Sequence, residues 1–155
     1  DQQGATLHPG FPRIKLWSDA LDHFELDRRD LIPDLTRTEK YHLRLEPSDG
    51  FHTAALPLHR LYLLERSSDD QVHIEPVRGH AAMSLITENT YRVGIAHRMG
   101  AAAPHLIRCG EIARRIEVFR FQRPWQLDGL AASTEALLAH MQAPFVRELA
   151  DQAPG

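Results

Sequence analysis

Apolar residues recur with two different periods along this chain, and the segments that carry the two periods alternate. In residues 39–45, Tyr41, Leu43 and Leu45 alternate with polar residues, which is the pattern of a strand with one solvated face. Between residues 80 and 99, apolar residues recur instead with the 3.6-residue period of a helix face. Because the two kinds of segment interleave, the sequence predicts an α/β structure, a mixed sheet with flanking helices.

These periods, with Pro and Gly taken as breaks, predict the individual elements. We expect strands at residues 5–8, 13–17, 39–45, 58–66, 72–77 and 116–121. We expect helices at residues 18–26, 80–99, 104–115 and 130–141. Ser18 is placed to cap the first of these helices, Gly100 to end the second, and Pro104 to open the third.

Three local patterns predict finer detail. Residues 61–64 are apolar on both faces, which favours a central position in the sheet. Residues 72–77 follow a polar turn and therefore predict a hairpin partner of that strand, with Pro76 near a sheet edge. Asn89 falls on the apolar helix face, so we expect it to be a buried, hydrogen-bonded amide, or else to mark the rim of a site.

The length and composition fit one globular domain. The chain has 155 residues, of which 43% are hydrophobic and 25% are charged, values typical of a folded protein. No repeat and no internal domain boundary is visible. We therefore expect one domain over residues 1–142, followed by a tail, residues 143–155, that frays.

Charge and hydropathy exclude several classes of partner. The net charge of −3 provides no basic field for nucleic acid or for an anionic membrane. No apolar run approaches the roughly 20 residues that span a bilayer. Cys109 is the only cysteine, which excludes an internal disulfide and is consistent with a reducing, cytoplasmic location.

The positions of the two lysines exclude one nucleotide-binding motif, the phosphate loop. A phosphate loop needs Lys directly after Gly, because its ammonium must reach phosphates held by glycine amides. Lys15 follows Ile14, and Lys40 follows Glu39. The chain therefore contains no phosphate loop.

Motifs for metal binding and for nucleophilic catalysis are also missing. The sequence has no His-Glu-x-x-His, no paired cysteines and no Gly-x-Ser-x-Gly. His105 and Cys109 are four residues apart on a predicted helix and could both face one ion. We favour the alternative, in which His105 is solvated and Cys109 packs as a small apolar residue, and we expect no metal.

Two groups of basic residues could hold an anion. Arg13 and Lys15 share one face of a predicted strand, just after a Pro-Gly turn, and could bind a phosphate or carboxylate; the alternative is an exposed strand face. A second group surrounds the junction between the predicted third helix and the strand after it: Arg108, Arg114, Arg115, Arg120 and Arg123. For that group we favour solvated side chains, with Glu111 and Glu117 as local partners.

Residues 9–20 read Pro-Gly-Phe-Pro-Arg-Ile-Lys-Leu-Trp-Ser-Asp-Ala. This stretch resembles the segment that follows the phosphate-loop core in bacterial serine kinases similar to HPr kinase. The resemblance continues in order through Leu56-Pro57-Leu58, residues 61–65, Thr90-Tyr91-Arg92 and residues 116–120. It covers roughly residues 8–140.

The resemblance implies part of an HPr kinase and phosphoenolpyruvate carboxykinase fold that lacks the phosphate-loop half. It implies that ATP and Mg²⁺ bind segments upstream of Asp1, and that this chain holds no cofactor. It carries no catalytic residue onto a numbered position. Because the resemblance places those segments before Asp1, and the chain does not begin with Met, we expect it to be the C-terminal part of a longer protein.

Two functions follow as expectations. In the first, the chain completes an ATP-dependent serine kinase whose substrate is a protein or peptide, with Arg13 and Lys15 near the transferred phosphate. In the second, the chain is a non-catalytic module that binds a peptide or partner protein. A sheet cut at this point would expose an edge strand, so homo-oligomers are also expected.

Overall fold

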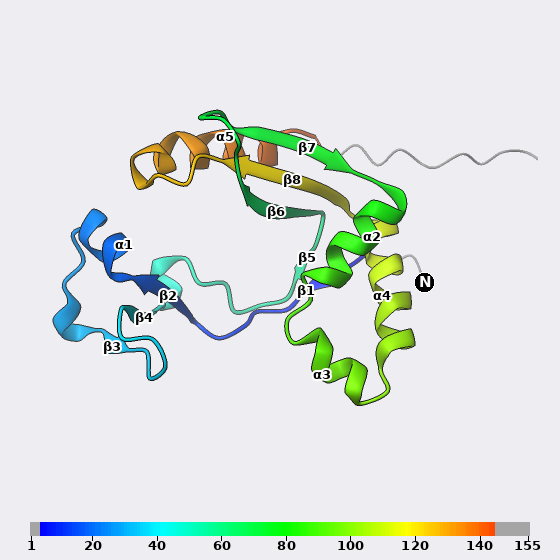
Figure 1. Ribbon diagram of the computed structural model, residues 1–155, viewed down its shortest axis with the longest axis horizontal. Coiled ribbons are helices and arrows are strands. Elements are labelled where there is room, and N and C mark those ends of the chain that lie inside the picture. Colours follow the sequence, from blue (N-terminus) through cyan, green and yellow to red (C-terminus); the bar gives the residue numbers. More distant parts are fainter. Residues whose placement is uncertain (1–3, 145–155) are drawn as a thin grey trace, which may run out of the picture. The chain divides into compact units, whose positions relative to one another are not determined.

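The structure, a computed structural model, describes residues 4–144, and the chain divides into two compact units (Figure 1). The N-terminal unit comprises Thr6–Leu56, and the C-terminal unit comprises residues 57–144 with residues 4 and 5. The sequence shows no boundary there, because the junctions are not polar linkers but two short strands that pair with each other, β1 (Thr6–Leu7) and β5 (Leu56–Pro57).

The N-terminal unit is built on a three-stranded antiparallel sheet. Its strands β2 (Arg13–Trp17), β4 (Lys40–Arg44) and β3 (Ile32–Pro33) lie in the order β2-β4-β3. The helix α1 (Ser18–His23) follows β2 directly and buries Leu21 completely. Short 3₁₀ turns, η1 (Arg28–Asp30) and η2 (Pro47–Asp49), complete the unit.

Two local expectations for this unit were wrong. Ser18 is the first helical residue, not the cap; the capping position is Trp17, and no side chain caps the helix. Residues 32 and 33 form the strand β3, which is not among the strands that we expected from the sequence. A two-residue strand is too short for its period to appear in the sequence, and Pro33 is tolerated because β3 lies at the sheet edge.

The C-terminal unit has a mixed three-stranded sheet in the order β6-β8-β7. β6 (Arg60–Arg66) runs parallel to β8 (Glu117–Arg123), and β7 (His73–Val77) runs antiparallel to it. Four helices belong to this unit: α2 (Gly79–Glu88), α3 (Val93–Arg98), α4 (Ala102–Arg115) and α5 (Leu130–Gln142). A 3₁₀ turn, η3 (Leu127–Gly129), precedes α5. The described chain is thus a mixed α/β structure, as the interleaved periods predict.

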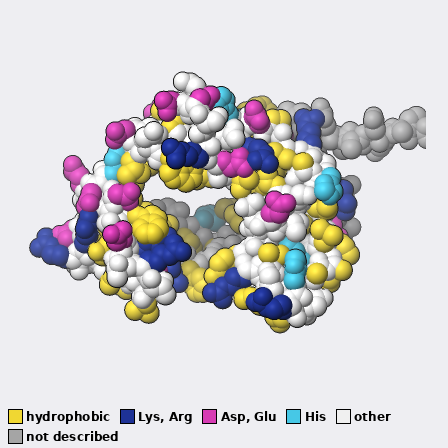
Figure 2. Space-filling model, viewed as in Figure 1, with side chains coloured by type: hydrophobic (Ala, Val, Ile, Leu, Met, Phe, Trp, Pro, Cys, Tyr) yellow, Lys and Arg dark blue, Asp and Glu magenta, His cyan; other side chains and the backbone are white. Residues whose placement is uncertain are grey.

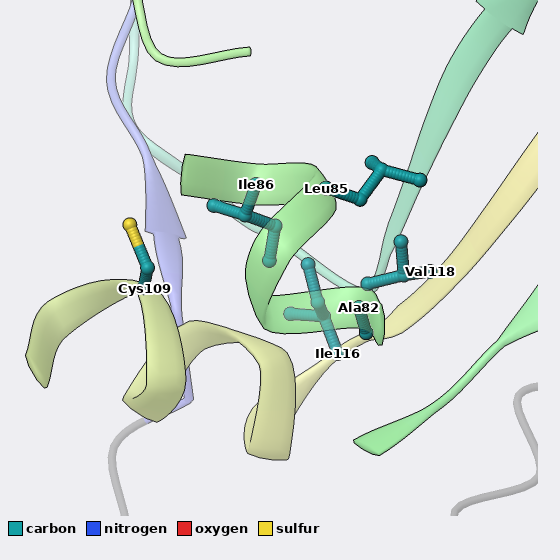
Figure 3. Packing of buried hydrophobic residues seen from close by; sticks show 6 residues of the cluster. All are labelled: Ala82, Leu85, Ile86, Cys109, Ile116 and Val118. Atoms are coloured by element: carbon teal, nitrogen blue, oxygen red, sulfur yellow. The ribbon is translucent and has the colours of Figure 1, made fainter. Parts of the chain in front are cut away.

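Helices cover both faces of this sheet. The core on one face joins α2, α4 and the start of β8 (Figure 3), and its buried residues are Ala82, Leu85, Ile86, Cys109, Ile116 and Val118. Leu61 and Leu63 of β6 pack against this cluster. On the opposite face, the rings of Tyr62 and Phe119 stack on each other, 5.2 Å apart, and both contact His140 of α5.

This layering explains why two strand expectations were wrong. β6 is an edge strand, and β8 is the central one. β6 is apolar on both faces because helices lie above and below it, not because strands flank it on both sides. β7 pairs with β8 and does not form a hairpin with β6, while Pro76 does lie in an edge strand, as expected.

The predicted helix at residues 80–99 is two helices. α2 ends at Glu88 and α3 begins at Val93, with Arg92 in the left-handed region at φ 55°. The side chains of Asn89 and Thr90 each donate a hydrogen bond of 2.9 Å to a backbone carbonyl four residues earlier, which satisfies the last turn of α2 and favours its end there. The apolar period continues across the break, so the sequence alone does not show it.

The helix expected at residues 18–26 ends earlier, at His23, and the last two expected helices form. Gly100 ends α3 with φ 78°, Pro104 lies in the first turn of α4, and α5 covers the expected last helix. The predicted fraying of residues 143–155 concerns, apart from the first two, residues outside the described part of the chain. Within residues 4–144, no helix combines the length and the apolar character that crossing a membrane requires.

Candidate functional site

The pairing of β2 with β4 gathers four basic side chains on one face of the N-terminal unit. Arg13 lies directly opposite Arg44, and Lys15 lies directly opposite His42. Residues opposed in this way on antiparallel strands point to the same side of the sheet. The structure thus brings the predicted pair, Arg13 and Lys15, together with two residues that sequence reasoning missed. We call these four side chains the basic face.

A single carboxylate anchors the inner part of the basic face. Lys15 Nζ lies 2.6 Å from Asp34 Oδ2, and His42 Nε2 lies 3.2 Å from the same oxygen. The other oxygen of Asp34 accepts hydrogen bonds from the Thr36 hydroxyl at 2.6 Å and from the Thr36 amide at 2.9 Å. Only 5% of the Asp34 side chain is exposed. The carboxylate therefore fixes the direction of Lys15 and His42.

These contacts determine the charge of Asp34. The ammonium of Lys15, followed by the hydroxyl and amide of Thr36, holds the pKa of Asp34 far below its ordinary value. The carboxylate is consequently ionised at neutral pH. The remaining ring nitrogen of His42, Nδ1, is buried and has no hydrogen-bond partner among the described residues.

The outer part of the basic face consists of Arg13 and Arg44, which are exposed to solvent. Arg13 is exposed, and its guanidinium carbon lies 5.5 Å from the centre of the Phe11 ring; within residues 4–144 it makes no ion pair. Arg44 Nε lies 2.8 Å from Glu46 Oε1, a pair in which both side chains are more than half exposed. Such exposed pairs hold their partners weakly. Both guanidinium groups remain accessible to an anion.

An apolar pocket of about 410 Å³ opens on the same face. It is lined by Phe11, Pro12, Arg13, Ile32, Pro33, Leu35, His42 and Arg44. Ile32 is directly opposite His42 in the pairing of β3 with β4, which continues the same face onto the next strand. Phe11, Ile32 and Leu35 are 82%, 70% and 101% exposed. Apolar surface therefore lies open next to positive charge.

Further along the same ladder, Trp17 faces Lys40, whose ammonium lies 4.2 Å from the ring centre. Arg37 lies over the same ring, at 5.8 Å. Figure 2 shows dark-blue basic side chains beside yellow hydrophobic ones on this unit, at the left of the view. Cations and apolar groups thus continue side by side along β2 and β4.

In the second basic group of the sequence, the acidic partners come from another strand. Arg120 pairs with Glu65 of the neighbouring strand, at 2.5 Å, and Glu117 pairs with Arg60. Glu117, which we expected to be a local partner of that group, thus pairs with Arg60 of β6, outside the group. The pairing of β6 with β8 supplies partners that are more than 50 residues away in sequence.

Asn89 marks the rim of a pocket, which is the second of its two expected roles, and it is not buried. Its side chain is exposed, and it lines a cavity of about 490 Å³ with Ser84, Glu88, Glu65 and Arg120. The helix face that carries Asn89 in the sequence ends at Glu88, so the residue follows the last turn instead of facing the core.

His105 and Cys109 behave differently from each other. Cys109 is 3% exposed and belongs to the core, as expected. His105 is half-buried instead of solvated, and its Nε2 lies 3.0 Å from Thr90 Oγ1 and 3.4 Å from Cys109 Sγ. Within residues 4–144, no three His, Cys, Asp or Glu side chains come together as a metal ion would require.

Comparison of the chain with models of protein families, with curated proteins and with solved structures yields no match.

The ion pairing of Asp34 predicts how the stability of the fold depends on pH. Since the folded state lowers the pKa of Asp34, its stabilising effect is complete above the unfolded pKa of about 4 and is lost as the pH falls from there toward the folded value. We expect Asp34→Asn to remove part of the fall in Tm below pH ~4. Thermal unfolding followed by circular dichroism between neutral and acidic pH measures this.

The control for this experiment is Asp22→Asn, which changes an aspartate of the same unit that is 68% exposed. Its acid dependence should match that of the unmodified chain. Some acid dependence should remain in Asp34→Asn, because hydrogen bonds from Ser67 and His73 lower the pKa of Asp69 to about 2. An acid limb of Asp34→Asn that superimposes on that of the unmodified chain would contradict the assignment.

Proposed function

We propose that this chain is the C-terminal portion of an ATP-dependent serine kinase similar to HPr kinase, and that its basic face holds an anionic group during phosphoryl transfer to a protein or peptide. The observation that carries the proposal is the pairing of β2 with β4. This pairing places His42 and Arg44 on the same face as the two predicted cations, Arg13 and Lys15. β2 lies within residues 9–20, the stretch with the most specific resemblance to these kinases.

The chemistry of phosphoryl transfer suits such a face. The protein contributes mainly positioning and stabilisation of charge, and it does little covalent chemistry. Lys15 is held in one direction by Asp34, while the guanidinium of Arg13 is exposed and forked, which matches two oxygens of a phosphate. In the proposal, Arg13 contacts the anion and Lys15 adds a fixed positive charge beside it. ATP and Mg²⁺ would bind upstream segments.

The test is phosphoryl transfer by the protein that includes the upstream region. We expect ATP- and Mg²⁺-dependent phosphorylation of serine in a protein or peptide, detected with radiolabelled ATP and mass spectrometry. The natural reading frame should contain Gly-x-x-x-x-Gly-Lys-Ser/Thr before residue 1 of this chain. A natural reading frame without that motif would overturn the kinase proposal.

A second candidate function is a non-catalytic module that binds a peptide or partner protein. The open apolar pocket beside the arginines favours it, because exposed apolar surface that adjoins charge is typical of binding sites. The two candidates differ in one result. A module of this kind binds its partner but transfers no phosphate, whether or not upstream segments are present.

We predict that the 155-residue chain alone does not bind ATP·Mg²⁺ more tightly than millimolar. Tight binding of a triphosphate needs amides presented by a glycine-rich loop and a lysine that follows it, and the sequence contains neither. Isothermal titration calorimetry measures this, and the protein with its upstream region is the positive control. Submillimolar affinity of the chain alone would show that it holds a nucleotide site of its own.

A further inference from the structure

The pocket on the basic face has an unusual combination of walls. Two arginines, Arg13 and Arg44, are directly opposed on neighbouring strands, and both line the pocket. Like charges that face each other across antiparallel strands destabilise the pair. Within the described residues, no acidic side chain pairs with Arg13, and Arg44 pairs only with the exposed Glu46. An anion placed between the two guanidinium groups would relieve this repulsion.

The rest of the pocket selects against a simple anion. Phe11, Ile32, Pro33 and Leu35 line it, and Phe11, Ile32 and Leu35 are mostly exposed to solvent. A free phosphate would leave this apolar surface uncovered. A ligand that covers the apolar residues and also pairs with the arginines carries a large apolar group within a few bonds of a carboxylate. The carboxylate is favoured because a guanidinium group binds it through two hydrogen bonds.

We propose that this pocket binds a peptide segment in which a large aliphatic or aromatic residue stands next to an acidic one. The apolar side chain would enter between Ile32 and Leu35, and the carboxylate would lie between Arg13 and Arg44. This inference deepens the proposed function, because it names the chemistry of the peptide that the kinase would hold, and it rests on that function for its role in phosphoryl transfer. Peptide binding itself needs no ATP.

The test uses the 155-residue chain and three synthetic peptides, measured by calorimetry. The first is acetyl-Gly-Ser-Glu-Leu-Glu-Ser-Gly-amide, the second has Gln in place of both Glu residues, and the third has Ser in place of Leu. We expect saturable binding of the first peptide and affinities at least about tenfold weaker for the other two, as for the loss of an anchor residue. Equal affinity for all three peptides, or no binding of the first, would overturn the proposal.

Variants of the chain locate the site. Arg13→Ala and Arg44→Ala should each weaken binding of the first peptide by about tenfold, and Leu35→Ser by a smaller factor. Arg29→Ala is the matched control, since Arg29 belongs to the same unit and its side chain is 88% exposed. Its affinity should stay within about twofold of the unmodified chain. Equal losses of affinity in Arg29→Ala and Arg13→Ala would show that the effect comes from the net charge of the chain, and this result would overturn the proposal.

Two further measurements test whether a simple anion or a second copy of the chain occupies the pocket in place of a peptide. Inorganic phosphate at equal concentration should not displace the first peptide; full displacement would make the site one for simple anions. Light scattering should show no self-association that Arg44→Ala abolishes; such self-association would make a second copy of the chain the occupant. Because these measurements contain no ATP, they can fail while phosphoryl transfer succeeds, and the reverse also holds.

Discussion

Replacing Arg13 and Lys15 together by alanine in the protein that includes the upstream region is expected to lower phosphoryl transfer by roughly 10²- to 10³-fold, the loss typical of removing a positioned donor to developing charge. The two side chains leave the same strand face, and both neighbours across the ladder, His42 and Arg44, are also basic. The rate should fall far more than the stability, because exposed strand charges away from a site usually change stability by less than about 0.5 kcal/mol.

The contact of Lys15 with Asp34 requires a refinement of this experiment. Lys15→Ala leaves the nearly buried carboxylate of Asp34 without its ammonium, which would lower stability for reasons unrelated to transfer. The double variant is therefore best made in an Asp34→Asn background, with Asp34→Asn alone as its reference. Arg13→Ala, which breaks no ion pair among the described residues, is measured separately in the unmodified protein.

The readouts are the rate of phosphoryl transfer and the Tm of each variant. Arg29→Ala serves as the control here as well, because its guanidinium is exposed and, within the described part of the chain, forms an ion pair only with the nearby Asp27. Transfer within about twofold of the reference in the double variant, together with an unchanged Tm, would assign the basic face to solvent. The proposed role in catalysis would then be lost, whatever the peptide titrations show.

Arg60→Met is expected to be the most destabilising charge substitution in the C-terminal unit, with a loss of about 3 kcal/mol in the free energy of unfolding. Arg60 Nη1 donates to the carbonyls of His140 and Met141, and Nη2 donates to those of Ala143 and Pro144, at 2.8 to 3.0 Å. One guanidinium thus satisfies carbonyls that the end of a helix leaves without partners.

The same side chain also holds Glu117, with Nε 2.7 Å from Oε2, and only 10% of it is exposed. Methionine keeps most of the packing and removes every donor, so the loss reports the hydrogen bonds and the ion pair. Urea unfolding measures the free energy, and hydrogen exchange of the α5 amides should rise more than that of α2.

The matched control is Arg66→Met, at the other end of the same strand, where the side chain is exposed. Its effect should stay within about 0.5 kcal/mol. A further variant, Arg60→Lys, keeps the charge beside Glu117 but cannot reach several carbonyls at once, and it should lie between the two. Equal losses in Arg60→Met and Arg66→Met would show that Arg60 does not stabilise the end of α5.

The sequence predicts the individual helices and strands of this fold better than it predicts which strands pair with each other. The alternation in residues 39–45 and the 3.6-residue period near residues 104–115 are properties of single segments, and both elements form as expected. The position of β8 between β6 and β7 is not a property of any segment. It depends on contacts across some 50 residues, and neither period nor propensity reports such contacts.

The candidate site shows the same division. Arg13 and Lys15 could be predicted as a pair because their spacing of two residues fixes a common strand face. His42 and Arg44 carry the same spacing in an equally polar strand, but only the register of β2 with β4 shows that they join the pair. Asp34 could not be found at all, since it follows a two-residue strand that no pattern reveals.

The order of strands in the C-terminal sheet has a consequence for synthesis on the ribosome. β8 is the last of its three strands to be translated, yet in the described sheet both β6 and β7 take their hydrogen bonds from it. A nascent chain that ends before residue 117 therefore exposes two strands without their neighbour, with Leu61, Leu63 and Ile74 among their apolar residues. Such chains are prone to aggregate and to depend on chaperones until the missing strand emerges.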